Sequence, residues 1–238
     1  MMKMNILCCD EKQEFIEKWI QRVKPYLGDE KCYCIDTCTT VAQVDQLLLN
    51  KGYDIAFIDT EINGESGIDL VGRLRIRNPR VCIFLVTEHE DYITTAFNIR
   101  VFQYIFKNDK REAILEREIR RAIRLYKFDK VKCFIRTNSG RYSFMPQEIY
   151  YIETRNGDVK MSTTLGDYYG EIENIDKMKK ELQWFDFYQV HQNYFVNMNT
   201  IISIKKGGVL LENNEIIPTS ILNREMIKER INLFLKSE

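Results

Sequence analysis

The chain of 238 residues is 45% hydrophobic and 29% charged, and its 35 basic and 35 acidic side chains cancel to a net charge of zero. This profile excludes a disordered chain and predicts one or two soluble globular domains. No run of about 18 apolar residues is present, which excludes a helical membrane span, and the neutral balance means that any contact with nucleic acid must come from local clusters of charge.

The first half of the chain alternates short apolar runs with segments of helical periodicity. Strands are predicted over residues 4–9, around 35, and over 55–59, 81–86 and 103–106. Helices are predicted over residues 11–26, 41–48, 67–77, 92–98 and 115–126. Five strand–helix pairs with almost continuously apolar strands predict an α/β domain built on a doubly wound, five-stranded parallel sheet covered on both faces.

The pattern changes near residue 130 to short strands separated by turns. Strands are predicted over residues 131–136, 141–145, 149–153, 159–164, 201–204 and 209–211, with Asn156-Gly157 as a type I′ turn signal. Short amphipathic helices are predicted over 175–182 and 220–235. We therefore predict a first domain over residues 1–126, a linker over 127–131 and a mostly β domain over 132–238.

The first apolar segment and the cysteines indicate where the protein resides. Residues 4–9 have no basic region before them and no small-residue cleavage site after them, which is typical of a strand rather than of a signal peptide. The seven cysteines include no C-x-x-C pair, so we expect reduced thiols rather than a disulfide framework or a zinc site. Both features predict a cytoplasmic protein.

Polar residues that could carry chemistry stand at the ends of the predicted parallel strands, and these ends meet at one edge of the sheet. Asp10 and Glu11 follow the first strand and Asp59 ends the third. Thr87 and Lys107 end the fourth and fifth. Carboxylates that crowd together are typical of a divalent cation site, and Mg²⁺ suits carboxylates, carbonyls and a phosphate oxygen. A lysine and a hydroxyl beside them could hold phosphoryl oxygens.

This combination resembles the receiver domain of bacterial two-component response regulators, a flavodoxin-like fold, over residues 4–125. The resemblance implies phosphorylation of one aspartate, with bound Mg²⁺ and residues that sense the phosphoryl group. The implied roles are phosphoacceptor for Asp59, metal ligands for Asp10, Glu11, Asp59 and the backbone carbonyl of Glu61, phosphoryl sensing for Thr87 and Lys107, and an aromatic switch for Tyr104.

Three positions depart from the receiver pattern. Glu11 stands where Asp is usual, which puts magnesium affinity in doubt. Asn63 and Asn108 each stand where Pro is usual. The replacement at position 108 predicts a trans peptide bond after Lys107 and a different direction of the Lys107 side chain. Tyr104 on its own fits a core residue as well as a switch. The interpretation as an atypical receiver that signals without phosphate therefore stays open.

The second half resembles the LytTR DNA-binding domain over residues 130–238. The matching stretches are Glu148-Ile-Tyr-Tyr-Ile-Glu153, the stretch from Phe187 to Asn197, and Ile216-Ile-Pro-Thr-Ser220. The resemblance implies loops that enter major grooves at direct-repeat promoter sites. The residues implied in DNA contact are Arg155, Lys160, His191, Gln192, Asn193 and Arg224.

Several of these DNA contacts have an alternative interpretation. His191 could serve only to hydrogen-bond its own turn, and Gln192 and Asn193 could be plain turn residues, although Asn and Gln are the side chains that suit adenine. The family places an Arg just after Ser220, where this chain has Ile221. Either Arg224 takes over that contact or the affinity for DNA is reduced.

The leading interpretation is a transcription regulator, not an enzyme, that a sensor histidine kinase phosphorylates. Phosphorylation is expected to produce a homodimer through the face formed by residues 92–98, 103–106 and 115–126, and two protomers would then bind two DNA repeats. The alternative is an atypical receiver joined to a β domain that binds a protein partner, or that binds DNA independently of phosphorylation. No membrane partner is expected.

Overall fold

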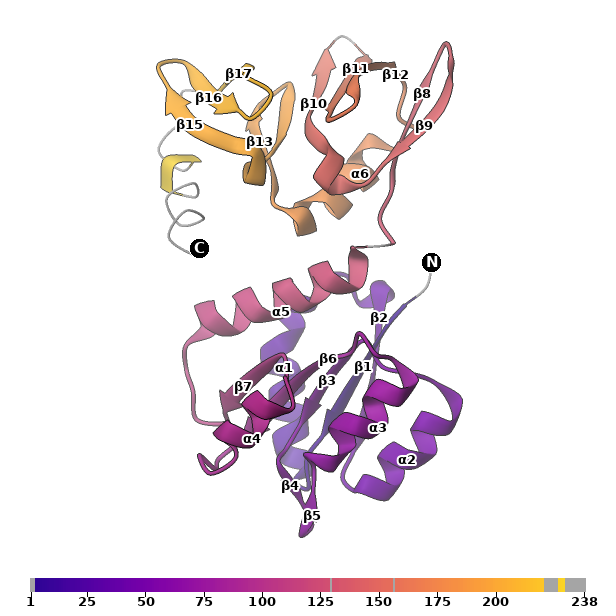
Figure 1. The fold of residues 1–238 in the computed structure, drawn as a ribbon, viewed down its shortest axis with the longest axis vertical. Coiled ribbons are helices and arrows are strands. Elements are labelled where there is room, and N and C mark those ends of the chain that lie inside the picture. The colour runs from indigo at the N-terminus through magenta and orange to yellow at the C-terminus, as the bar shows by residue number, and fades with distance from the viewer. Residues whose placement is uncertain (1–2, 129, 156, 221–226, 230–238) are drawn as a thin grey trace. The chain divides into compact units, whose positions relative to one another are not determined.

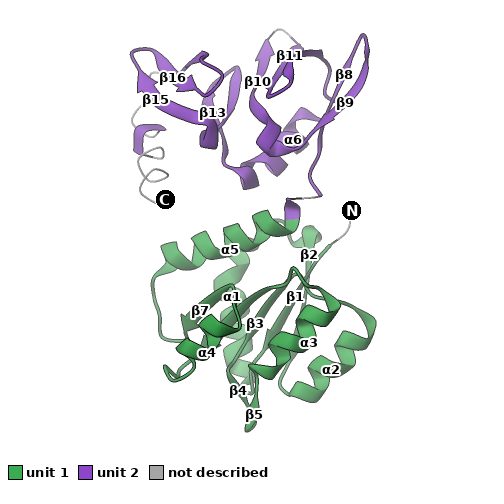
Figure 2. Ribbon diagram, in the orientation of Figure 1, with its two compact units in different colours: residues 1–126 green, residues 127–238 purple. Residues whose placement is uncertain are grey.

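A computed structural model describes residues 3–128, 130–155, 157–220 and 227–229. The chain divides into two compact units, residues 1–126 and residues 127–238 (Figure 2). Among the described helices, none is both long and apolar enough to cross a membrane.

The first unit is built on a parallel sheet with the strand order β2-β1-β3-β6-β7 (Figure 1). The predicted doubly wound α/β fold is confirmed. Its strands are β1 (Met4–Cys9), β2 (Tyr33–Cys38), β3 (Ile55–Ile58), β6 (Cys82–Thr87) and β7 (Gln103–Phe106). Its helices are α1 (Gln13–Leu27), α2 (Val41–Asn50), α3 (Asp69–Arg77), α4 (Ile93–Asn98) and α5 (Glu112–Lys127).

The two faces of this sheet are covered by different helices. Successive strand residues point to opposite faces, so Leu7 and Ile58 pack with α2, α3 and α4 in one core, whereas Phe57 faces Trp19 of α1. A hairpin of two short strands, β4 (Glu61–Ile62) and β5 (Glu65–Ser66), lies directly after β3 and was not predicted from the sequence.

The second unit consists mainly of antiparallel strands, as predicted. A five-stranded sheet has the order β12-β11-β10-β14-β13, a three-stranded sheet the order β15-β16-β17, and β8 pairs with β9. The strands are β8 (Cys133–Thr137), β9 (Gly140–Phe144), β10 (Ile149–Arg155), β11 (Asp158–Thr163), β12 (Gly166–Gly170), β13 (Phe187–His191), β14 (Tyr194–Asn197), β15 (Ile201–Lys205), β16 (Gly208–Leu211) and β17 (Ile216–Pro218).

The five-stranded sheet of this unit separates two hydrophobic cores. Ile152 and Phe195 face a core shared with α6 (Ile175–Leu182) and the β8–β9 hairpin. Tyr151 and Val196 point the other way and pack with the three-stranded sheet. Both faces of the five-stranded sheet are therefore covered.

Candidate functional site

Three of the predicted site residues meet at the carboxyl edge of the parallel sheet. Asp10 follows β1, Asp59 follows β3 and Lys107 follows β7. Lys107 Nζ lies 2.5 Å from Asp10 Oδ2 and 2.5 Å from Asp59 Oδ2. None of the three side chains is more than 9% exposed, so water screens these charges weakly. The described residues contain no cis peptide bond, and Lys107 reaches both carboxylates with Asn108 as its neighbour.

Burial opposes the ionisation of Asp59 and of Lys107. It raises the pKa of the Asp59 carboxyl above its ordinary value, although the hydrogen bond from Lys107 acts in the opposite direction. For Lys107, burial lowers the pKa, but the hydrogen bonds to Asp10 and Asp59 outweigh it, so the pKa of the ammonium lies above its ordinary value. One ammonium between two carboxylates leaves a net negative charge, which a further cation could neutralise.

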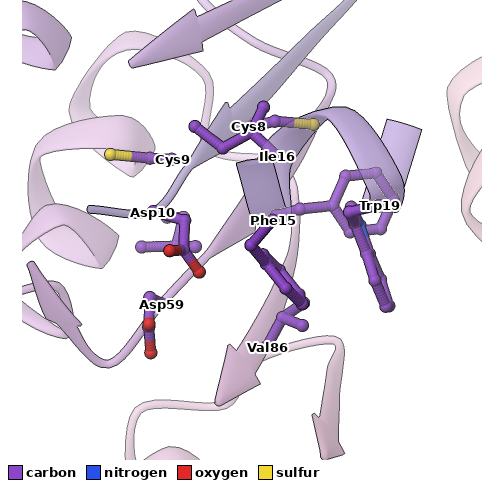
Figure 3. Close-up of a pocket in the computed structure, with 10 residues that line it drawn as sticks. Cys8, Cys9, Asp10, Phe15, Ile16, Trp19, Asp59 and Val86 are labelled. Atoms are coloured by element: carbon purple, nitrogen blue, oxygen red, sulfur yellow. The ribbon is translucent and has the colours of Figure 1, made fainter. Parts of the chain in front are cut away.

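An aromatic side chain that the sequence interpretation treated as part of a helix face also lies at this site. Figure 3 shows Phe15 beside Asp10 and Asp59 in a pocket. The Phe15 ring centre is 4.4 Å from Lys107 Nζ, a cation–π contact. Phe15 also stacks on Trp19, with ring centroids 5.9 Å apart. An aromatic residue on the apolar face of a helix gives no sequence signal that separates this role from ordinary packing.

Thr87 and Tyr104 are connected through the backbone of one residue, His89. The His89 N–H donates to Thr87 Oγ1 over 3.2 Å, and the Tyr104 hydroxyl donates to the His89 carbonyl. Thr87 is fully buried, and its hydroxyl lies 2.7 Å from the hydroxyl of Thr60, a residue that the sequence did not single out. The two predicted signalling residues therefore share one peptide segment.

The hairpin after Asp59 explains the missing proline at Asn63. Asn63 and Gly64 have φ values of 52° and 78°, the pair of positive angles that a type I′ turn needs. Proline is fixed near −65° and cannot adopt this conformation. The Asn63 N–H donates to Glu11 Oε2 over 3.1 Å, so the Glu11 carboxylate is bound to the hairpin. Within the described parts of the chain, no three His, Cys, Asp or Glu side chains are grouped as metal ligands.

Two carboxylates nevertheless fit a magnesium ion. Asp10 Oδ1 accepts a hydrogen bond from Lys12 N over 2.9 Å, whereas the buried Asp10 Oδ2 has the Lys107 ammonium 2.5 Å away. Magnesium is usually held by one or two carboxylates together with waters and substrate phosphates. Asp10 and Asp59 satisfy this requirement, and Glu11 as a third side-chain ligand stays a prediction.

The predicted DNA-contact residues around His191 form the turn between β13 and β14, which we call the recognition turn (residues 191–194). His191 Nδ1 accepts a hydrogen bond from Asn193 N over 3.2 Å. The Gln189 amide donates to three carbonyls of this segment, those of His191, Gln192 and Tyr194, over 2.6, 3.2 and 3.3 Å. Gln192 is exposed and Asn193 half-buried. One side chain that the sequence interpretation missed therefore fixes the shape of the turn.

Other segments meet the recognition turn at the same end of the sheet. Thr154 N donates to Asn193 O over 2.8 Å, which places the exposed Arg155 close by. Ser220 N donates to Val190 O over 3.0 Å, so the segment before the predicted third contact also ends here. Arg224 itself lies outside the described residues.

Lys160 was expected to be a free residue in a loop, but the structure places it in a strand. It lies within β11, its side chain is 17% exposed, and it pairs with Asp167 over 2.8 Å and with Glu215 over 3.7 Å. Burial lowers its pKa, but the hydrogen bonds to Asp167 and Tyr151 and the charge of Glu215 raise it above the ordinary value. These internal partners argue against a role of Lys160 in binding a DNA phosphate.

We expect Gln189→Met to weaken DNA binding about tenfold, because the loss of three donated hydrogen bonds frees the recognition turn while the length of the side chain is kept. Titration of a labelled duplex in a fluorescence anisotropy assay measures this. Gln183→Met, at an exposed glutamine of the same domain, is the matched control and should bind like the wild type. Equal affinities of the two variants for DNA would contradict the role of Gln189 in holding the shape of the recognition turn.

Two family models match this chain, one in each of its two units. A response regulator receiver domain model matches residues 6–118, and a LytTr DNA-binding domain model matches residues 139–232. The sensory transduction protein LytR of Staphylococcus saprophyticus is 22% identical over 72% of this chain and 76% of its own length. The sensory transduction protein LytT of Bacillus subtilis is 23% identical over 79% of this chain and 83% of its own. Among solved structures, a CheY-like receiver domain protein of Methanospirillum hungatei aligns with 53% of this chain and 98% of its own, with 16% identity and a TM-score of 0.45.

The doubly wound sheet with two aspartates and a lysine at its carboxyl edge defines a signalling receiver. With the second match, the chain belongs to the response regulators that join a receiver domain to a LytTR DNA-binding domain. Proteins of this class are DNA-binding transcription regulators that phosphorylation controls, and they are not enzymes.

Proposed function

We propose that Asp59 accepts the phosphoryl group from a sensor histidine kinase. The contact that carries this proposal is the Lys107 ammonium 2.5 Å from the Asp59 carboxylate, with neither side chain more than 9% exposed. A carboxylate oxygen of Asp59 attacks the phosphorus, and the bond between the phosphorus and the donor breaks. Lys107 and the Thr87 hydroxyl then hold the oxygens of the transferred group.

The pair Asp10 and Asp59, with the backbone carbonyl of Glu61, would hold Mg²⁺ at this site. A bound divalent cation neutralises the charge that develops on the phosphoryl oxygens. Glu11 accepts a hydrogen bond from the Asn63 N–H at Oε2 over 3.1 Å, which leaves Oε1 as its oxygen for the metal while this bond holds. This contact supports weak magnesium binding before phosphorylation.

The phosphoryl group would act on the rest of the receiver through Thr87. When the Thr87 hydroxyl turns to a phosphoryl oxygen, it leaves Thr60 and the His89 N–H. The His89 carbonyl, which accepts from Tyr104, then changes its position, and Tyr104 changes with it. By this change of position, Tyr104 acts as the switch that alters the face formed by α4, β7 and α5.

Dimerisation through that face follows as the next step. Phe97 of α4 is 84% exposed and Ile93 is 47% exposed, which supports a partner for this helix. Two protomers place two LytTR domains on one DNA, and binding of the second domain gains from its high effective concentration.

We propose that the domain binds direct-repeat promoter sites. The residues that would contact the bases are His191, Gln192, Asn193 and Arg155, with Arg224 as the candidate third contact. Because its proposed partners are a kinase and a promoter, we propose that the protein acts in the cytoplasm.

The test is binding of the full-length protein to the DNA upstream of its own gene, with and without acetyl phosphate and Mg²⁺. We expect tighter binding with both, and a steep fall of affinity with salt because phosphate contacts release counterions. No gain from acetyl phosphate would contradict the proposed control by phosphorylation. No binding to this duplex or to any member of a random-sequence pool would contradict the proposed role in DNA reading.

A second candidate function is DNA binding independent of phosphorylation. It is favoured by the Glu11 contact with Asn63, which keeps the third carboxylate of the receiver pattern on the hairpin. Equal affinity with and without acetyl phosphate is the result that this candidate predicts. A β domain that holds a protein partner instead is the remaining interpretation when no DNA is bound.

A further inference from the structure

One segment of the LytTR domain carries basic residues without any acidic residue. From Lys130 to Gln147 the sequence has four basic residues and no acidic residue, whereas from Glu148 to the end it has 11 basic and 14 acidic residues. This basic segment contains the β8–β9 hairpin, which lies outside the recognition turn. The rest of the domain is acidic on balance, which is unfavourable for DNA unless a local positive surface compensates.

The strand register places these charges on the outer face of the hairpin. Cys133 and Ile135 point into the core, and the alternate residues of β8, Phe134 and Arg136, are exposed. Arg136 lies directly opposite Arg141 of β9. Like charges that face each other across two strands destabilise a hairpin, so the folded state does not account for this pair.

Among the residues that the structure describes, the two arginines have no acidic partner that would explain them. Arg136 is joined to Glu171 of the neighbouring segment through backbone hydrogen bonds of 2.9 and 2.8 Å, yet in the described part of the chain neither Arg136 nor Arg141 forms an ion pair with Glu171 or any other carboxylate. The Arg141 guanidinium lies 4.4 Å from the centre of the Phe134 ring. This cation–π contact holds the guanidinium in place, which reduces the entropy that binding would cost.

We infer that the outer face of the β8–β9 hairpin is a second DNA-binding surface, on which Arg136 and Arg141 contact phosphates of the DNA backbone. Paired guanidinium groups match phosphate oxygens in charge and hydrogen-bond geometry. The surface supplies affinity that is independent of base sequence, whereas the recognition turn supplies the preference for bases. This inference rests on the proposed DNA-reading function of the domain.

The test compares full-length wild type with the double variant Arg136→Ala/Arg141→Ala on two duplexes, the DNA upstream of its own gene and a scrambled duplex of the same length. We expect the variant to bind both about tenfold more weakly, and the slope of log affinity against log salt to fall by about 2, because each lost phosphate contact removes about 0.9 from the slope. The thermal midpoint should not fall, since the opposed charges are removed.

Two controls separate this surface from a general loss of charge. Arg136→Lys/Arg141→Lys keeps the positive charges and should keep the wild-type slope. Lys177→Ala/Lys180→Ala removes two exposed charges from α6 of the same domain and should also leave the slope unchanged. An unchanged slope in the double alanine variant overturns the hairpin proposal alone if the wild type binds, whereas a wild type that binds neither duplex overturns the proposed function as well.

Discussion

Asp59→Asn is expected to abolish phosphorylation of the protein by acetyl phosphate, and with it phosphate-dependent dimerisation and the gain in DNA affinity. Asparagine keeps the shape of the side chain but removes the nucleophilic carboxylate and the negative charge that pairs with the Lys107 ammonium. Intact mass spectrometry shows the presence or absence of one added phosphoryl group. Size-exclusion chromatography with light scattering reports the dimer.

The Asp59→Asn protein should fold at least as stably as the wild type. Burial raises the pKa of Asp59, so the ionised carboxylate destabilises the folded state at pH values above that pKa, and a neutral amide removes this cost. Asp69→Asn, at an exposed position of α3, is the matched control and should be phosphorylated normally. Dimerisation of Asp59→Asn on addition of acetyl phosphate would sink the proposed mechanism.

Gly67→Ala is expected to lower the free energy of unfolding by about 3 kcal/mol and to prevent phosphorylation. A Cβ atom at this position would lie 1.8 Å from the backbone oxygen of Asp59, so the backbone that carries the phosphoacceptor must move. The Gly67 N–H also donates to Thr60 O over 2.9 Å, which closes the hairpin after β3. Urea unfolding measures the stability and mass spectrometry the phosphorylation.

Gly72→Ala is the matched control for this substitution. Gly72 is exposed in α3, and a Cβ atom built on it meets nothing within 4 Å. Alanine is favoured over glycine inside a helix by about 1 kcal/mol, so this variant should be slightly more stable and fully active. Equal stability of the two alanine variants would show that the close approach of Gly67 to Asp59 has no energetic weight.

The sequence predicts most of the receiver because its strands are apolar on both faces and its polar residues stand at strand ends. Asp10, Asp59 and Lys107 could be assigned to one edge by topology alone. The β4–β5 hairpin was missed because each strand has only two residues and shows no periodicity. The role of Phe15 at Lys107 could not be predicted, since a helical aromatic residue is equally typical of a core.

The LytTR domain was less predictable from its residues. Strand β12 reads Gly-Asp-Tyr-Tyr-Gly, which has no alternation of apolar and polar residues, and its pairing with β11 is a tertiary feature. Lys160 has the charge expected of a DNA contact, but the fold places Asp167 of the neighbouring strand and Glu215, from the segment between β16 and β17, beside it. Gln189 has its three acceptors two to five residues away, so its role depends on the fold of the turn and not on sequence spacing.

The connection between Thr87 and Tyr104 passes through the backbone of His89 and not through its side chain, which is exposed. Every residue except proline carries the same N–H and C=O groups. If the proposed switch operates, non-proline substitutions at position 89 should keep the signal, whereas loss of the Thr87 or Tyr104 hydroxyl, each of which forms one of the two bonds, should remove it.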